Sequence, residues 1–148
     1  MTVTRCSLSE IPKLVPLFDS YRSFYSQTSD VTGAKAFLTQ RIEGNESVVF
    51  VALDDSGHAV GFTQLYPLFS SVSMKRIWLL NDLFVVEGSR KQGIGEALLN
   101  KAKEFAEKSG AGGILLETGT ENVNAQKLYE KLGYRRNTET YFYFLKVF

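Results

Sequence analysis

The sequence contains very little cysteine, histidine and proline. Its 148 residues include one cysteine, Cys6, one histidine, His58, and three prolines. A single cysteine excludes an intramolecular disulfide, so the fold must be held by its core. Because no histidine lies near it in the sequence, we expect Cys6 to be a buried, inert thiol rather than a nucleophile. One histidine cannot form a cluster of imidazole ligands, so we expect no metal.

The sequence also lacks long apolar runs and an excess of either charge. No apolar stretch approaches the roughly 20 residues of a membrane-spanning helix. Residues 1–10 hold no hydrophobic signal core, so we expect a cytoplasmic protein without a membrane partner. The 17 basic and 16 acidic residues leave a net charge of +1. This balance argues against nucleic acid as a partner, because such proteins present broadly basic surfaces.

Length and periodicity predict one mixed α+β domain over residues 1–148. The order of elements is typical of a mostly antiparallel, twisted sheet flanked by helices. Its central parallel βαβ unit comprises strand 75–86, helix 94–108 and strand 114–118, with a right-handed crossover. The other predicted strands are 2–6, 48–53, 59–66 and 141–148, and the other helices follow residue 7 and cover 32–43 and 124–132.

A basic, glycine-bearing loop joins strand 75–86 to helix 94–108. Glycines let the backbone approach a ligand, and a helix N-terminus adds partial positive charge, so the loop suits a pyrophosphate. A third glycine of G-x-G-x-x-G is missing, and there is no G-K-S/T, which argues against Rossmann and Walker loops. Such a turn can also precede a helix without any ligand. The predicted ligand contacts are Arg90, Lys91, Gln92, Gly93, Ile94, Gly95 and Glu96.

A second motif follows at residues 122–134 and reads N-x-x-A-x-x-L-Y-x-x-x-G-Y. Together with R-x-x-G-x-G at residues 90–95, in this order and at this separation, it resembles the GNAT superfamily of acetyl-CoA-dependent N-acetyltransferases. The motifs cover about a third of the chain, and the order of elements extends the resemblance to nearly all of it. The resemblance implies a GNAT-like fold and an enzyme that takes acetyl-CoA as cosubstrate and an amine as acceptor.

The resemblance also implies roles for individual residues. The backbone of Leu83, Phe84 and Val85 would pair with the pantetheine arm like an added strand, while their side chains pack in the core. Asn122 would bind the same arm, although asparagine is equally suited to cap the following helix. Tyr129 would give a proton to departing coenzyme A. Its alternative role is to pack on the sheet.

Two carboxylates are candidates for the base that deprotonates the amine. Some GNAT enzymes place a glutamate where Glu117 stands, on strand 114–118. The rival is Asp82; relatives that acetylate polyamines often show L-E-D here, and Asn81 replaces that glutamate, which counts against a polyamine-type base. A carboxylate in an apolar strand is costly unless it is used or paired. Each of the two could therefore instead make a structural hydrogen bond.

We therefore expect direct acetyl transfer to a primary amine in a ternary complex, because no cysteine is placed for an acyl-enzyme. The favoured acceptor is a small-molecule amine such as a polyamine or amino acid. The alternatives are a protein lysine or N-terminal acetyltransferase and a non-catalytic acyl-CoA-binding regulatory module. The family builds its acceptor site near Tyr21, Phe24 and Tyr25, whose spacing fits a core stripe equally well. The aromatic segment 141–148 could pair two subunits into a homodimer.

Overall fold

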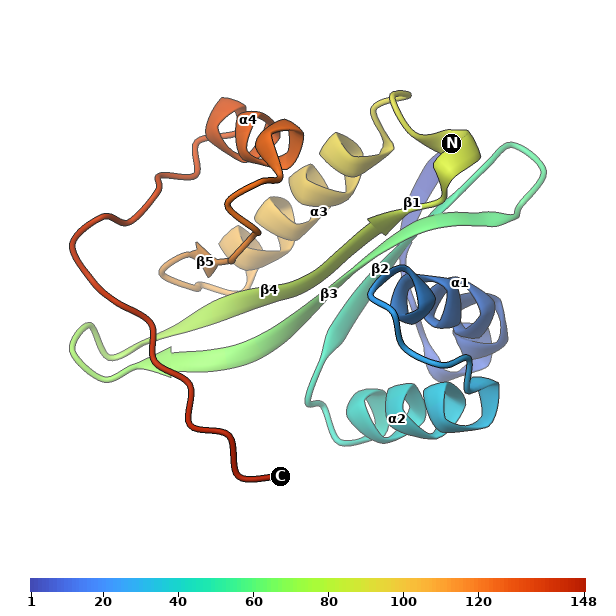
Figure 1. The fold of residues 1–148 in the computed structure, drawn as a ribbon, viewed down its shortest axis with the longest axis horizontal. Coiled ribbons are helices and arrows are strands. Elements are labelled where there is room, and N and C mark those ends of the chain that lie inside the picture. Colours follow the sequence, from blue (N-terminus) through green and yellow to red (C-terminus); the bar gives the residue numbers. More distant parts are fainter. The chain divides into compact units, whose positions relative to one another are not determined.

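The structure is a computed structural model that describes residues 1–148 (Figure 1). The chain forms two compact units, Met1–Leu116 and Glu117–Phe148. Each unit is described by itself below, and a single acetyltransferase domain over 1–148 stays a prediction. No helix is long and apolar enough to cross a membrane.

The first unit is built on a five-stranded sheet in the order β1-β2-β3-β4-β5. The first four strands pair antiparallel, and β4 pairs with β5 in parallel, which confirms the predicted mixed, mostly antiparallel sheet. Helix α3 joins β4 to β5 and completes the parallel βαβ unit. The strands are β1 (Thr2–Arg5), β2 (Val48–Leu53), β3 (Ala59–Ser70), β4 (Lys75–Val85) and β5 (Ile114–Leu115). The helices are α1 (Ile11–Phe24), α2 (Val31–Glu43) and α3 (Ile94–Lys108), with short 3-10 turns at Leu8–Glu10 and Glu87–Ser89.

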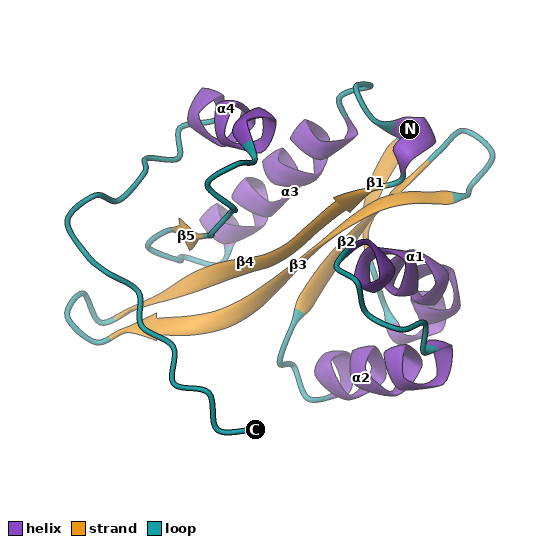
Figure 2. Ribbon diagram, viewed as in Figure 1, coloured by secondary structure: helices purple, strands orange, loops and turns teal.

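Successive residues of β3 face opposite layers of helices, because side chains alternate along a strand. The ring of Phe62 lies 6.0 Å from that of Phe18 and 5.4 Å from that of Tyr21, both on α1. A Cβ atom on the preceding Gly61 would instead lie 3.2 Å from Ile94 of α3. Helices α1 and α2 therefore cover one face of the sheet, and α3 covers the other (Figure 2).

A bulge interrupts β4 at its middle. Gln64 of β3 pairs with Asp82, but the next residue, Leu65, pairs with Leu80, so Asn81 is the extra residue. Such a bulge bends the strand and increases its twist, and bulges are common beside active sites. The ladder to β5 ends with the pair Leu79 and Leu115. Beyond it, one edge of β4 has no strand partner within this unit.

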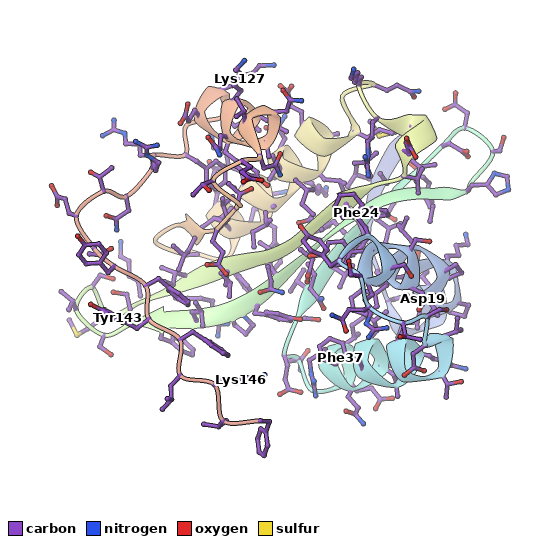
Figure 3. The ribbon with its side chains drawn as sticks, in the orientation of Figure 1. Asp19, Phe24, Phe37, Lys127, Tyr143 and Lys146 are labelled. Carbon is purple, nitrogen blue, oxygen red and sulfur yellow. The ribbon has the colours of Figure 1, made fainter.

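The expected final strand, 141–148, is wrong. These residues form no helix or strand, and their side chains are exposed, from Tyr141 at 89% to Phe148 at the C-terminus. A strand exists only in a ladder, and the second unit, which holds helix α4 (Val123–Lys131), contains no strand to pair with. Figure 3 labels Tyr143 and Lys146 on this segment.

The strand expected at 114–118 is shorter than predicted and less buried. Only Ile114 and Leu115 pair with β4, and the side chain of Leu115 is 53% exposed. Within the first unit this strand has a neighbour on one side only, which explains its exposure. Glu117 lies outside the ladder, in the second unit.

Candidate active site

The loop at residues 90–95 makes the start of α3 an uncapped helix N-terminus. Gly93 precedes the helix with φ 79°, a left-handed conformation that glycine adopts without strain. No side chain caps the first turn, and the first bond of this turn runs from the Ala97 amide to the Gly93 carbonyl, 3.0 Å. The first amides of a helix have no partner within it, so this end offers backbone donors and partial positive charge to an anion.

Arg90 lies between this loop and the end of β4. Its Nε donates to the Val85 carbonyl oxygen over 2.9 Å. The guanidinium carbon also lies 5.5 Å from the ring centre of Phe24 and 5.9 Å from that of Phe84, within cation–π range. Arg90 thus joins the end of β4 to the last turn of α1.

The end of β4 turns part of its backbone away from β3. The Val86 amide donates to the Val60 carbonyl across the ladder, 2.9 Å. Hydrogen-bonding direction alternates along an antiparallel strand, so Leu83 and Val85 direct their N–H and C=O groups to the open edge. The backbone of Phe84 faces β3, and its ring packs 5.7 Å from that of Tyr21. Leu83 therefore presents its N–H and C=O groups to a ligand and Val85 its N–H group, while the Val85 carbonyl already accepts from Arg90.

A cavity of about 520 Å³ lies on the α1 and α2 face of the sheet. A cavity of this size suits a small molecule. Its lining includes Tyr21, Tyr25, Phe37, Tyr66 and Asp82. Of the aromatic residues expected near the acceptor, Tyr21 and Tyr25 line this cavity. Phe24 is 62% exposed and contacts Arg90 and Phe84 instead.

Asp82 is 7% exposed and lines this cavity. Its Oδ2 accepts from Gln64 Nε2 at 2.9 Å, and its Oδ1 accepts from Asn81 Nδ2 at 3.1 Å. The side chain of Thr63 donates to the Asp82 carbonyl oxygen at 2.8 Å. Burial, and then the charge of Asp82, raise the pKa of Tyr21.

Tyr66, a second phenol of the cavity, responds in the same way. Burial, with the charge of Asp82 as the next cause, raises the pKa of Tyr66 to about 12. Both phenols therefore stay protonated at neutral pH and can donate hydrogen bonds into the cavity.

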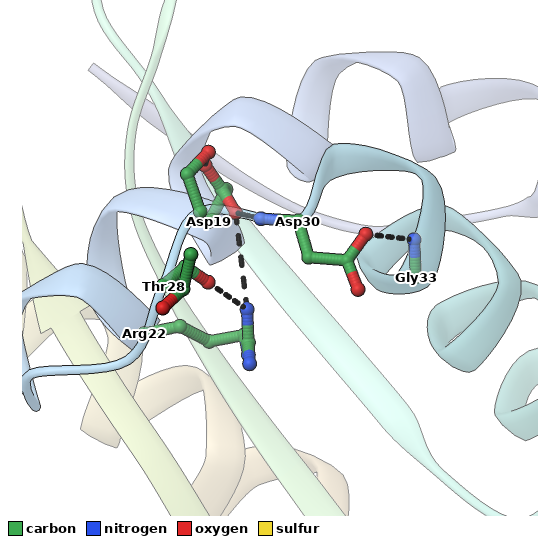
Figure 4. A network of polar contacts seen from close by, with 6 residues as sticks. Asp19, Arg22, Thr28, Asp30 and Gly33 are labelled. Atoms are coloured by element: carbon green, nitrogen blue, oxygen red, sulfur yellow. Dashed lines mark hydrogen bonds and ion pairs between the residues drawn. The ribbon is translucent and has the colours of Figure 1, made fainter.

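A polar network fixes the loop between α1 and α2, which forms one wall of the cavity (Figure 4). Asp19 accepts from the Asp30 amide at 2.8 Å and from the Ser29 hydroxyl at 2.6 Å. Arg22 donates to the Thr28 carbonyl at 3.0 Å. Asp30 caps α2 by accepting from the Gly33 amide at 2.8 Å. These hydrogen bonds tie the loop to α1 and to the first turn of α2.

The remaining predicted residues lie in the second unit. Asn122 caps α4, its Oδ1 accepting from the Ala125 amide at 3.4 Å, so its capping role is observed. The ring of Tyr129 packs 5.8 Å from that of Tyr134. Glu117 is exposed and precedes α4. The first unit thus brings Asp82, the end of β4 and the loop together, whereas these three residues belong to the second unit.

Sequence reasoning missed Gln64, Tyr66 and Phe37. For Gln64 and Tyr66 the available signal was the alternation of side chains along β3. This alternation places both residues on the same face of the sheet as Phe62, the face that α1 and α2 cover. Nothing in the sequence marks Asn81 as a bulge. No group of three or more histidine, cysteine, aspartate or glutamate side chains is placed to hold a metal ion.

Comparison with known proteins gives a consistent result. The model of the acetyltransferase (GNAT) family matches residues 14–134. An uncharacterized N-acetyltransferase of Bacillus subtilis is 48% identical over 147 residues, covering 99% of this chain and 98% of that protein. A probable acetyltransferase of Haemophilus influenzae is 36% identical over 127 residues, covering 86% and 85%. The crystal structure of a probable acetyltransferase superposes with a TM-score of 0.94 at 39% identity, covering 99% and 98%.

Proposed function

Because the chain belongs to the GNAT family of acetyltransferases, we propose that it transfers the acetyl group of acetyl-CoA to a primary amine of a small molecule. The family uses acetyl-CoA as cosubstrate, so the chain is an acyltransferase. The observation that carries the choice of a small acceptor is the 520 Å³ cavity, which has aromatic walls and the buried carboxylate of Asp82.

The residues present fit the cosubstrate. The outward backbone groups of Leu83 and Val85 suit the amides of a pantetheine arm, which would pair as an added strand. The uncapped start of α3 suits a pyrophosphate, and the charges of Arg90 and Lys91 add to its attraction. Acetyl-CoA supplies an activated acetyl group as a thioester. We propose that Asn122 also binds the arm, through the part of its amide that the capping bond leaves free.

The chemistry requires a neutral amine and a protonated leaving group. The amine nitrogen forms a bond to the acetyl carbon, and the carbon–sulfur bond breaks. We propose that Tyr129 gives its proton to the sulfur and later regains one from water. The proton lost by the amine goes to Glu117 or Asp82. Direct transfer needs no acyl-enzyme, and Cys6 is buried with a pKa raised to about 11 by burial and then by Glu10, which makes it a poor nucleophile.

Thiol release from acetyl-CoA across a panel of amines tests this proposal. The panel would hold polyamines, amino acids, aminoglycosides and lysine peptides. Turnover on one small-molecule class is the expected result. Turnover on lysine peptides alone would favour a protein acetyltransferase. Acetyl-CoA binding without turnover on any amine would favour the non-catalytic binding module.

A further inference from the structure

Asp82 is a buried carboxylate that has hydrogen-bond donors but no cationic partner. Gln64 and Asn81 donate to its two oxygens. None of the ion pairs in the structure includes Asp82. Burying a charge without a partner of opposite sign is costly, so this carboxylate is suited to a cation that arrives from outside.

The charges of the cavity wall favour the same conclusion. The lining contains one basic residue, Arg22, and two acidic residues, Asp30 and Asp82. Arg22 is directed to the Thr28 carbonyl and lies 4.0 Å from Asp19, which is not part of the lining. One oxygen of Asp30 already accepts the capping bond from Gly33. Asp30 is also exposed, so water and salt screen its charge, whereas Asp82 is the buried negative charge of the cavity.

Two fully buried side chains of β3 fix the position of Asp82. Thr63 holds its carbonyl oxygen, and Gln64 holds its carboxylate. The carboxylate also sets the orientation of the Gln64 amide, because a flipped amide would bring two oxygens together. In this orientation Gln64 Oε1 is buried without a hydrogen-bond partner, which costs free energy. Gln64 is thus a positioning residue, held in a costly arrangement that aims Asp82.

While a nitrogen is held as an ammonium by this carboxylate, it has no lone pair with which to attack. Pairing with a negative charge favours the protonated form, whereas attack requires a free lone pair. We propose that the cavity selects small acceptors with two basic nitrogens, one held as an ammonium by Asp82 and the other neutral and acetylated. Tyr21, Tyr25 and Phe37 provide apolar walls for the methylenes between them. This inference rests on the proposed function.

Cadaverine and hexylamine test the proposal, because they are equal in length and differ only in the terminal ammonium. Turnover would be measured with acetyl-CoA, and binding of each amine would be measured by calorimetry with coenzyme A present. We expect kcat/KM and affinity to favour cadaverine by about 10- to 100-fold, the range for a hydrogen bond to a charged group. Asp82→Asn should collapse this ratio toward one. Gln64→Leu should also reduce the preference for cadaverine, mainly by raising KM for cadaverine. A loss of stability alone would not raise KM for one amine and leave the other unchanged.

Asp30→Asn is the matched control, since it removes the other acidic charge of the cavity while asparagine still caps a helix. It should preserve the ratio. Equal binding of both amines, or an equal loss in Asp30→Asn and Asp82→Asn, would overturn the proposal. Preferred binding of cadaverine that depends on Asp82, without turnover of any amine, would support this inference and reject the proposed function.

Discussion

The Nε atom of Arg90 lies 2.9 Å from the carbonyl oxygen of Val85. This carbonyl belongs to the open edge of β4, where we propose that the pantetheine arm binds. Arg90 is therefore already in contact with the strand that would receive the arm, and it also starts the loop that would receive the pyrophosphate. One residue connects the two halves of the proposed cosubstrate site.

Replacing Arg90 should weaken acetyl-CoA binding. Arg90→Ala removes a full charge and the bond to Val85, and we expect about a 10- to 100-fold loss of affinity, the range for hydrogen bonds to charged groups. Arg90→Lys keeps the charge but loses the planar guanidinium group. The affinity of this variant for acetyl-CoA should therefore lie between those of the wild type and of Arg90→Ala. Calorimetric titration with acetyl-CoA measures the effect. An alanine variant that binds as tightly as the wild type would exclude Arg90 from the site.

Tyr129→Phe should lower kcat by about 100-fold or more while leaving KM for acetyl-CoA nearly unchanged, because general acid catalysis acts in the transition state. Tyr134→Phe is the control, because it removes the same hydroxyl group from a ring that packs 5.8 Å from that of Tyr129. Steady-state kinetics on the best amine of the panel make the comparison. Equal losses in the two variants would point to a packing role for Tyr129.

Gly61→Ala should destabilise the first unit and disturb the start of α3. A Cβ atom there would meet the Phe84 carbonyl at 3.0 Å and Ile94 at 3.2 Å. Overpacking of this kind costs about 1–3 kcal/mol. Gly88→Ala, where nothing lies within 4 Å, should change stability by less than about 0.5 kcal/mol. Urea unfolding of both variants tests the difference, and a neutral Gly61→Ala would show that α3 and β3 approach less closely.

Asp19 should stabilise the loop between α1 and α2 at neutral pH and not in acid. Hydrogen bonds from Ser29 and the Asp30 amide, with a smaller effect of Arg22, lower the pKa of Asp19 below its usual value of 3.8. A carboxyl group whose pKa is lowered by folding stabilises the folded state at pH values above its usual pKa. This stabilisation is lost as the pH falls through the folded-state pKa. Asp19→Asn should therefore lower the urea midpoint at neutral pH, and the difference should shrink below about pH 3.8. Glu121→Gln, which changes an exposed carboxylate outside this loop, is the control variant.

The exposed segment 141–148 should join two copies of the chain. Seven of its side chains are aromatic or aliphatic and largely exposed, and an unpaired aromatic segment readily adds to a strand edge. We expect light scattering to give the mass of a dimer. Deletion of the segment should give the monomer mass. A monomer mass for the intact chain would reject the homodimer.

Local sequence was sufficient to predict the family, most elements and the proposed phosphate loop. Gly93 and Gly95 at the start of an amphipathic helix, and the spacing that ends at Tyr129, are short-range patterns in the sequence. The capping of α4 by Asn122 follows from the same local chemistry. These features depend on residues that are adjacent in the chain, so they can be read from the sequence alone.

The acceptor cavity was decided by tertiary structure. Gln64 and Asp82 are far apart in sequence, and they meet only because β3 and β4 pair in one register with a bulge at Asn81. A shift of one residue would turn Asp82 to the opposite face. The final strand failed for the same reason: the aromatic pattern of 141–148 gives β propensity, but a ladder requires a partner that propensity cannot supply. What the sequence determined was local conformation, whereas the pairing of distant strands decided which side chains meet.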